Sequence, residues 1–263
     1  MPMSFETLIV EHRGAVSWLY LNRPTVLNAV GKHGMVELRQ AFTDLRDRKE
    51  TRVIVFSGKG RAFCAGADLT AKPDPEAEPS DEPTFLDLAT AMEEVLLSIK
   101  KPILAAVNGI ACGGGLEMAM MCDFIIACRS AKIGDAHANF GLMPGGGASV
   151  RLPRIVGVNR ARYMMYTGDL FTAEEMAKAG LVTVLTEDDA LERDTQAIAE
   201  KIAAKSPLGI GRMKTLINDG MDIPAAHAIR MEKLMVQNHF HSFDASEGGR
   251  AFEEKRKPQF KGY

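Results

Sequence analysis

The sequence predicts a mixed α/β fold in which short buried strands alternate with helices, followed by a mostly helical C-terminal region. Runs of apolar and β-branched residues, such as 53–56 and 103–107, end near glycine or asparagine and are typical of buried strands. Apolar residues recur at helical spacing between these runs, for example over 35–45. The alternation indicates stacked ββα or βαβ units around a core that 46% hydrophobic residues can fill.

The first predicted elements are a hairpin, a helix and a strand. Residues 8–10 and 16–21 are apolar segments on either side of an Arg-Gly turn, so they are expected to pair as a hairpin. Residues 35–45 have apolar positions three or four apart with charges between them, which predicts an amphipathic helix. Residues 53–56 are β-branched or aromatic, and a strand is expected there.

The middle of the chain continues this alternation. Residues 71–83 contain four prolines and five acidic residues and predict an exposed loop. After that loop we expect a helix at 85–99, a strand at 103–107, a second helix at 114–122 and a second strand at 124–127. An irregular stretch is expected at 134–147.

From about residue 159 helical spacing dominates, with one short strand expected at 181–185. Four amphipathic helices are predicted at 190–204, 207–219, 224–238 and 245–255. We therefore divide the chain into a core over residues 1–200 and a helical region over residues 201–263. The apolar faces of that second region are expected to contact other subunits.

Composition excludes several classes of function. A net charge of −2 gives no electrostatic reason to expect binding to nucleic acid or to a membrane surface. No apolar run reaches the roughly 20 residues of a membrane span, and the N-terminus lacks the pattern of a secretory signal. The four cysteines show no C-x-x-C spacing, so no metal site is expected. These features predict a cytoplasmic protein.

The most informative segment runs from Ala106 to Glu117. An apolar strand leads through three consecutive glycines, residues 113–115, into an apolar helix. The N-terminus of a helix presents unpaired backbone N–H groups, and glycine lets a ligand approach them closely. A carboxylate, Glu117, lies one turn further on. The segment suits stabilisation of an anionic oxygen beside a proton-transferring side chain, although a plain glycine-rich turn is an alternative.

A second segment of this kind precedes it by about forty residues. The strand at 53–56 leads through glycines into a run of small residues, 59–69. Two such turns can direct two backbone N–H donors at one oxygen. Two donors are what a thioester carbonyl needs as it becomes an enolate.

Five motifs, in order along nearly the whole chain, are similar to those of one family. They are Leu21–Pro24 with Asn28–Ala29, Phe63–Leu69, Asn108–Glu117 with Met120–Asp123, Pro144–Gly147, and Phe252–Pro258. The chain resembles the enoyl-CoA hydratase/isomerase (crotonase) superfamily. The resemblance implies a spiral of repeated ββα units with a helical C-terminal trimerisation region, a homotrimer or dimer of trimers, and an acyl-CoA thioester as substrate. It implies no cofactor apart from the coenzyme A of the substrate.

The resemblance also assigns catalytic roles by motif position. The two oxyanion donors fall on the backbone N–H groups of Ala67 and Gly114, and Glu117 matches the first of two family glutamates. The second glutamate is replaced by His137, and Asp135 lies two residues before it. An imidazole can act as acid or base near neutral pH, so His137 can take over the missing role, oriented by Asp135 or another carboxylate. The other interpretation is that His137 is a bystander in the pocket.

Contacts with the substrate follow from the same motifs. Leu142 is expected in the acyl pocket, Phe240 beside the adenine, and Lys255 at the nucleotide, often that of a neighbouring subunit. The remaining positions expected to bind the substrate or coenzyme A are Leu27, Ala65, Gly66, Asp68, Leu69 and Gly113.

Three functions remain open at this point. The favoured one is a lyase or isomerase that adds water to, removes it from, or shifts the double bond of a 2-enoyl-CoA. The second is a carbon–carbon bond hydrolase that acts on a diketone with His137 as base. A hydrolase branch of the superfamily has a histidine there, but it also has an aspartate where this chain has Gly146. The third is a non-catalytic acyl-CoA binder.

Overall fold

The computed structural model describes residues 5–70 and 82–263, and most of the loop expected at 71–83 lies outside these ranges. The strands are β1 Leu8–Arg13, β2 Val16–Leu21, β3 Val53–Gly58, β4 Ala62–Cys64, β5 Ile103–Val107, β6 Ile110–Cys112, β7 Phe124–Cys128, β8 Lys132–Gly134, β9 Phe171–Thr172 and β10 Val182–Thr186. The helices are α1 Lys32–Asp47, α2 Phe85–Ser98, α3 Gly114–Met121, α4 Ala148–Val156, α5 Val158–Thr167, α6 Ala173–Lys178, α7 Leu191–Ala203, α8 Pro207–Gly220, α9 Ala225–Phe240 and α10 Phe243–Glu253.

Two sheets form the core. The larger one has the strand order β1-β2-β3-β5-β7-β10, and the smaller one has the order β4-β6-β8-β9. All neighbouring strands are parallel except the β1–β2 hairpin and the β8–β9 pair. Each turn of the chain therefore adds one strand to each sheet: β3 then β4, β5 then β6, β7 then β8.

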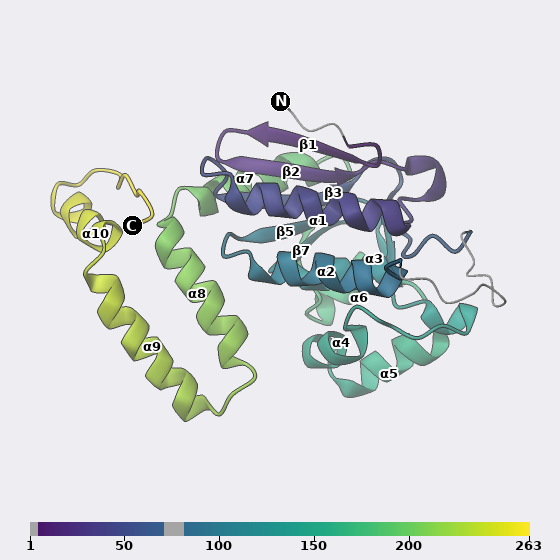
Figure 1. The fold of residues 1–263 in the computed structure, drawn as a ribbon. Coiled ribbons are helices and arrows are strands. Elements are labelled where there is room, and N and C mark those ends of the chain that lie inside the picture. Colours follow the sequence, from purple (N-terminus) through teal and green to yellow (C-terminus); the bar gives the residue numbers. More distant parts are fainter. Residues whose placement is uncertain (1–4, 71–81) are drawn as a thin grey trace.

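Helices cover both faces of the larger sheet. Helices α1 and α2 lie side by side in front of it in Figure 1, and α7 packs behind it on β2, β3, β5 and β7. Helix α3 follows β6 and contacts β4, β6 and β7. Its seven residues from Gly115 to Met121 are all buried, so α3 is an internal helix of the core.

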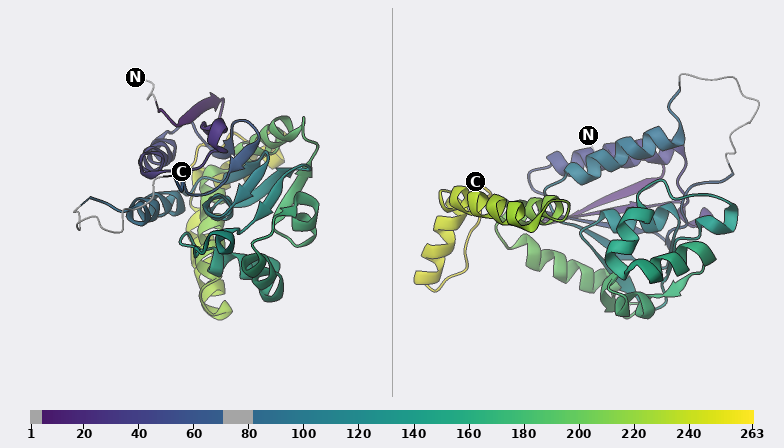
Figure 2. Two further views of the ribbon diagram at one scale, coloured as in Figure 1. Left: turned by 90° about the vertical axis from the view of Figure 1, so that its right-hand side faces the viewer. Right: turned by 90° about the horizontal axis from the view of Figure 1, so that it is seen from below.

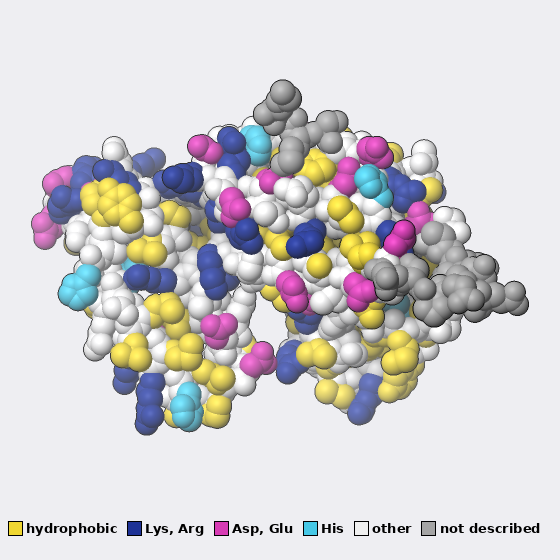
Figure 3. Space-filling view, in the orientation of Figure 1, with side chains coloured by type: hydrophobic (Ala, Val, Ile, Leu, Met, Phe, Trp, Pro, Cys, Tyr) yellow, Lys and Arg dark blue, Asp and Glu magenta, His cyan; other side chains and the backbone are white. Residues whose placement is uncertain are grey.

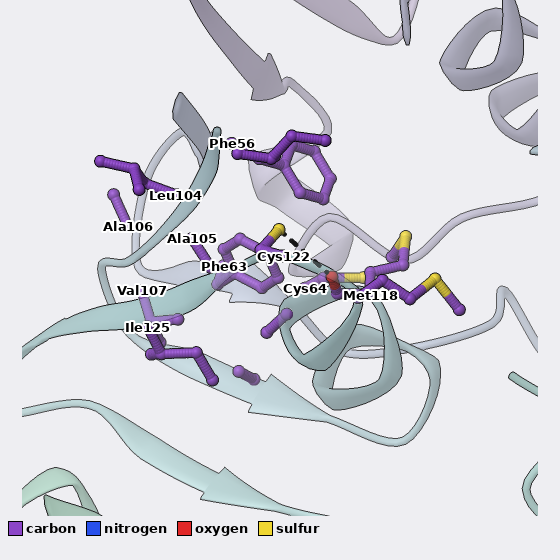
Figure 4. Close-up of a cluster of buried hydrophobic side chains, with 14 of the residues drawn as sticks. Phe56, Phe63, Cys64, Leu104, Ala105, Ala106, Val107, Met118, Cys122 and Ile125 are labelled. Atoms are coloured by element: carbon purple, nitrogen blue, oxygen red, sulfur yellow. Dashed lines mark hydrogen bonds between the residues drawn. The ribbon is translucent and has the colours of Figure 1, made fainter. Parts of the chain in front are cut away.

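The hydrophobic core is continuous through the sheets and α3. Phe56 is fully buried, and its ring makes edge contacts with Phe42 and Phe63 at centroid distances of 5.5 and 5.2 Å. Figure 4 shows Phe56 and Phe63 beside Met118 and Cys122, where the Cys122 thiol donates to the Met118 carbonyl at 3.5 Å. Burial raises the pKa of the Cys64 thiol to about 12, so that cysteine is neutral and acts as a small core residue.

Helices α8, α9 and α10 extend away from this core, as two further views show (Figures 1 and 2). Helices α8 and α9 pack on one another, and α9 has no buried residue. Their exposed apolar side chains include Met213, Ile217, Ile229 and Leu234. The boundary of this region at residue 201 stays a prediction, although α8 begins nearby at Pro207.

Several expectations about the elements need correction. The four short strands β4, β6, β8 and β9 were not predicted, and the single strand expected after residue 159 is joined by β9. The stretch expected to be irregular at 134–147 contains a short 3₁₀ helix, His137–Phe140. Strands of two or three residues are too short to show a period of two, so sequence pattern cannot reveal them.

Replacing Phe56 with alanine should lower the free energy of unfolding by about 3–5 kcal/mol, because it leaves a cavity between two aromatic rings. The matched control is Tyr166→Ala, which removes an aromatic ring that is 76% exposed. That variant should stay within about 0.5 kcal/mol of the parent protein. Chemical denaturation followed by circular dichroism measures both, and equal losses would contradict the assigned core.

Candidate active site

The two glycine-rich turns identified in the sequence lie against each other. Strand β4 ends at Cys64 and β6 ends at Cys112, and these two strands are parallel neighbours. A Cβ atom at Gly115 would lie 2.1 Å from the Cys64 carbonyl oxygen, so any side chain there would separate the turns. A Cβ atom at Gly66 would lie 3.2 Å from the Gly114 nitrogen. Glycine therefore allows the backbones after β4 and β6 to touch.

Two backbone N–H groups are available at this contact. Gly114 is the first residue of α3, so its N–H has no acceptor within the helix. Ala67 forms a β-bridge with Val30. The bridge consists of two hydrogen bonds of 2.9 Å: the Val30 N–H donates to the Gly66 carbonyl, and the Asp68 N–H donates to the Val30 carbonyl. The Ala67 N–H is not used in that bridge. Donors placed in this way can bind one developing oxyanion.

Glu117 lies in the first turn of α3 and is 4% exposed. Its Oε1 atom accepts hydrogen bonds from the N–H groups of Gly146 and Ala148, at 2.8 and 3.0 Å. Burial raises the pKa of the Glu117 carboxyl above its ordinary value, and the two N–H donors partly oppose that shift. The Oε2 atom takes no hydrogen bond from these donors, so it is the oxygen available for proton transfer.

His137 faces this second oxygen. Its Nε2 atom lies 3.9 Å from Glu117 Oε2, and its Nδ1 atom lies 3.0 Å from Asp135 Oδ1. Asp135 is 1% exposed, and Ala136 adopts a left-handed conformation with φ 57° between the two. The hydrogen bond with Asp135 raises the pKa of His137, while burial opposes the rise. With Nδ1–H donating to Asp135, Nε2 carries the proton that can move in the site.

The turn before α4 supports Glu117, and sequence reasoning missed how it does so. The Arg151 guanidinium donates to the Gly146 carbonyl at 3.2 Å and to Glu93 on α2 at 2.9 Å. A Cβ atom at Gly146 would lie 3.0 Å from Glu117 Oε2, so a side chain there would displace the carboxylate. The glycines at 145–147 were the only signal in the sequence, and they pointed to a motif rather than to this contact.

Most other residues expected to bind the substrate surround the two turns. The Ala65 N–H donates to the Leu27 carbonyl at 3.0 Å, and a Cβ atom at Gly113 would lie 3.8 Å from His137 Nε2. Asp68 is paired with Arg23 at 2.8 Å, and hydrogen bonds from Thr70 and Arg23 lower its pKa to about 2. Asp68 is thus a structural anion. Gly66 lies at the contact itself, whereas Leu69 and Leu142 are exposed beyond it.

Phe240 and Lys255 are not brought to this place. Phe240 ends α9 and is 70% exposed, and Lys255 follows α10. Both helices lie at the end of the molecule away from α3 (Figures 1 and 2). Within one chain, neither residue can reach a ligand held by Ala67 and Gly114.

The described residues contain neither a metal-ligand cluster nor a membrane-spanning helix. Residues 5–70 and 82–263 contain no group of three or more His, Cys, Asp or Glu arranged to hold a metal ion. No helix in that part of the chain has the length and apolar character needed to cross a membrane.

Comparison with known proteins agrees with the motifs. Residues 11–263 match the family model described as enoyl-CoA hydratase/isomerase. The chain is 35% identical to a crotonyl-CoA hydratase of Syntrophomonas wolfei, over 98% of this chain and 99% of the relative. It is 38% identical to a probable enoyl-CoA hydratase of Rhizobium meliloti, over 98% of this chain and 99% of the relative.

A solved structure supports the fold. The enoyl-CoA hydratase from Bacillus anthracis superposes with a TM-score of 0.92 at 34% identity, covering 98% of this chain and 100% of the other. The predicted α/β class and the resemblance are both confirmed. The chain belongs to the enoyl-CoA hydratase/isomerase (crotonase) superfamily.

Proposed function

We propose that the protein adds water to the double bond of a 2-enoyl-CoA, using Glu117 and His137 as its acid–base pair. The observation that carries this proposal is the 3.9 Å approach of His137 Nε2 to Glu117 Oε2, beside the turn that holds the Gly114 N–H. A buried carboxylate and an imidazole with raised pKa values are expected where protons are transferred. The relatives named as hydratases support the same reaction.

The first role is to hold the substrate carbonyl. The N–H groups of Ala67 and Gly114 bind the thioester oxygen and stabilise the negative charge that it gains as the enolate forms. Removing one such donor typically costs about 3 kcal/mol of transition-state stabilisation. Because both donors are backbone groups on rigid turns, they need no rearrangement during the reaction.

The second role is proton transfer. The Glu117 carboxylate accepts a proton from water, and the resulting hydroxyl adds to the β-carbon of the enoyl group. The His137 imidazolium donates its Nε2 proton to the α-carbon, so the product gains one water in total. The proton left on Glu117 then returns to His137, which restores both groups. Asp135 keeps His137 protonated and oriented. The reverse steps would dehydrate a 3-hydroxyacyl-CoA, and the same two groups could shift a double bond.

The coenzyme A moiety is the only cofactor-like group in this proposal. We place its path along Leu27, Ala65, Gly66, Asp68 and Leu69, with Leu142 at the acyl end. Phe240 and Lys255 would serve the site of a neighbouring subunit, because they lie far from α3 in their own chain. A homotrimer or dimer of trimers, joined through α8, α9 and α10, would bring them there. A cytoplasmic location stays a prediction.

The hydrolase alternative has less support. The Asp135–His137 contact would suit a histidine base, but Gly146 stands where the hydrolase motif carries an aspartate. The Glu117 carboxylate lies so close to Gly146 that a side chain at that position would collide with it. The non-catalytic alternative leaves unexplained why the buried Glu117 and Asp135 flank the half-buried His137, since burying carboxylates costs free energy.

Glu117→Gln should lower turnover of crotonyl-CoA about a hundredfold or more, because the amide cannot accept the proton from water. Binding of the CoA ester should persist. Loss of enoyl-thioester absorbance measures turnover, and calorimetry measures binding. Glu94→Gln, an exposed carboxyl on α2, is the control and should behave like the parent enzyme. Parent-like turnover by Glu117→Gln would remove Glu117 from the mechanism.

Asp135→Asn should change the pH profile of turnover. The Asp135 carboxylate raises the pKa of His137, so its loss should lower that pKa toward or below the ordinary 6.5. The imidazolium needed as acid would then be lost at lower pH, and the basic limb of the profile should move to lower pH. An unmoved basic limb, in either Asp135→Asn or His137→Ala, would make His137 a bystander.

Gly146→Ala should lower kcat more than it changes KM. The added methyl would lie 3.0 Å from Glu117 Oε2 and displace the base, while the oxyanion donors remain. The control is Gly141→Ala, since a Cβ atom there meets nothing within 4 Å, although its φ of 64° adds some strain. Steady-state kinetics on crotonyl-CoA distinguish the two. Equal kinetics for both variants would argue against the assigned contact.

A further inference from the structure

A cavity of about 580 Å³ lies at the amino ends of the strands of the larger sheet, whereas Glu117 and His137 lie beyond the carboxyl ends. The two glycine-rich turns follow β4 and β6, which come after the carboxyl ends of β3 and β5. The cavity is lined instead by residues that come before these strands, such as Arg52 and Pro102, together with the N-terminal half of α8 and the tail at Lys261. It is therefore separate from the candidate active site.

The charge of this cavity is unusual for the chain. Seven of its 17 lining residues are lysine or arginine, and none is aspartate or glutamate. The whole chain, in contrast, has a formal net charge of −2. Figure 3 shows Lys and Arg side chains gathered where the upper part of α8 meets the core. Cations brought together in this way repel one another unless an anion lies among them.

Three of the seven cations have structural partners. The Arg52 guanidinium donates to the carbonyls of Ala203 and Phe260, at 3.1 and 2.7 Å. The Lys101 ammonium donates to two carbonyls at the end of α1, and the Lys261 ammonium lies 4.6 Å from the centre of the Phe243 ring. These contacts attach the helix ends and the tail to the core.

The other four, Lys49, Lys100, Lys205 and Arg212, have no side-chain hydrogen bond or ion pair with the described residues. The Arg212 Nη1 atom is buried without a hydrogen-bond partner among the described residues, which is costly for a charged group. Helices α1, α2 and α7 end near the three lysines, but each helix end offers only about half a negative charge. The Asp47 and Glu50 carboxylates act on Lys101, and Asp244 acts on Arg52, so the charge that lacks compensation is that of the other four cations.

We propose that this cavity binds a small organic molecule that carries two or more phosphate groups, such as a nucleoside diphosphate. Lys100, Lys205 and Arg212 would bind the phosphates, helped by the positive N-terminal end of α8. Ile202, Leu208 and Ile210 provide an apolar wall for the organic part. The volume lies within the range of about 300–1,000 Å³ that is common for ligand sites.

The test is isothermal titration calorimetry of the full-length, assembled protein with ADP, pyrophosphate and adenosine. The KM for crotonyl-CoA is measured with and without ADP in parallel, because ADP bound in the acyl-CoA site would raise that KM and ADP bound in the cavity would not. Both ADP and pyrophosphate should bind, with affinities that fall as salt rises, and adenosine should not. Tighter binding of ADP than of pyrophosphate would assign the apolar wall to a nucleotide, and equal binding would assign the site to the phosphates alone.

The variant Lys100→Gln/Lys205→Gln/Arg212→Gln should weaken ADP binding at least about tenfold, which is roughly 1.4 kcal/mol. The control Arg39→Gln/Lys132→Gln/Lys233→Gln removes the same charges from exposed positions outside the cavity and should bind ADP as the parent does. Thermal unfolding verifies that both variants are folded. Absent binding to the parent protein, or equal ADP affinity in the two variants, would overturn the proposal.

Discussion

The close approach of successive backbone turns is the constraint on which the site depends. Glycine occurs where one turn of the spiral meets the next: a Cβ atom at Gly109 would lie 2.2 Å from the Arg61 carbonyl, and one at Gly115 would lie 2.1 Å from that of Cys64. These contacts hold β4 and β6 in parallel register. The N–H groups of Ala67 and Gly114 are consequently directed from two rigid turns rather than from mobile side chains.

The same constraint explains how the chain tolerates a buried carboxylate. Helix α3 is forced into the core because its first turn is packed against β4. Glu117 is therefore buried away from solvent, and its charge is compensated by the backbone N–H groups of Gly146 and Ala148. Those donors belong to a turn that Arg151 attaches to α2 through Glu93. The position of the proposed acid–base pair thus depends on contacts between four separate segments.

The sequence was informative where the residues that share a function lie close together in the chain. Gly113–Gly115 and Glu117 are contiguous and follow a recognisable strand, so both the helix start and the buried carboxylate could be expected. His137 could be aligned because the motif on either side of it is intact. The Asp135–His137 contact needed only the spacing of two residues. In each case a local pattern was enough.

The remainder could not be predicted, because it depends on segments far apart in the chain. Arg151 and Glu93 are 58 residues apart, and no sequence pattern in either helix predicts that they form a hydrogen bond. The basic cavity joins residues near 50, 100, 205 and 261, each of which looks in sequence like an ordinary solvated charge. Phe240 and Lys255 were assigned from a motif, and the roles that we propose for them require a neighbouring subunit.

The most direct measurement is to incubate the parent enzyme with crotonyl-CoA in water labelled with heavy oxygen and to determine the product by mass spectrometry. Hydration by Glu117 and His137 predicts a product heavier than the substrate by one water, with the label in a hydroxyl group on the β-carbon. A product of unchanged mass with a shifted double bond, or recovery of bound but unreacted crotonyl-CoA, would contradict hydration by Glu117 and His137.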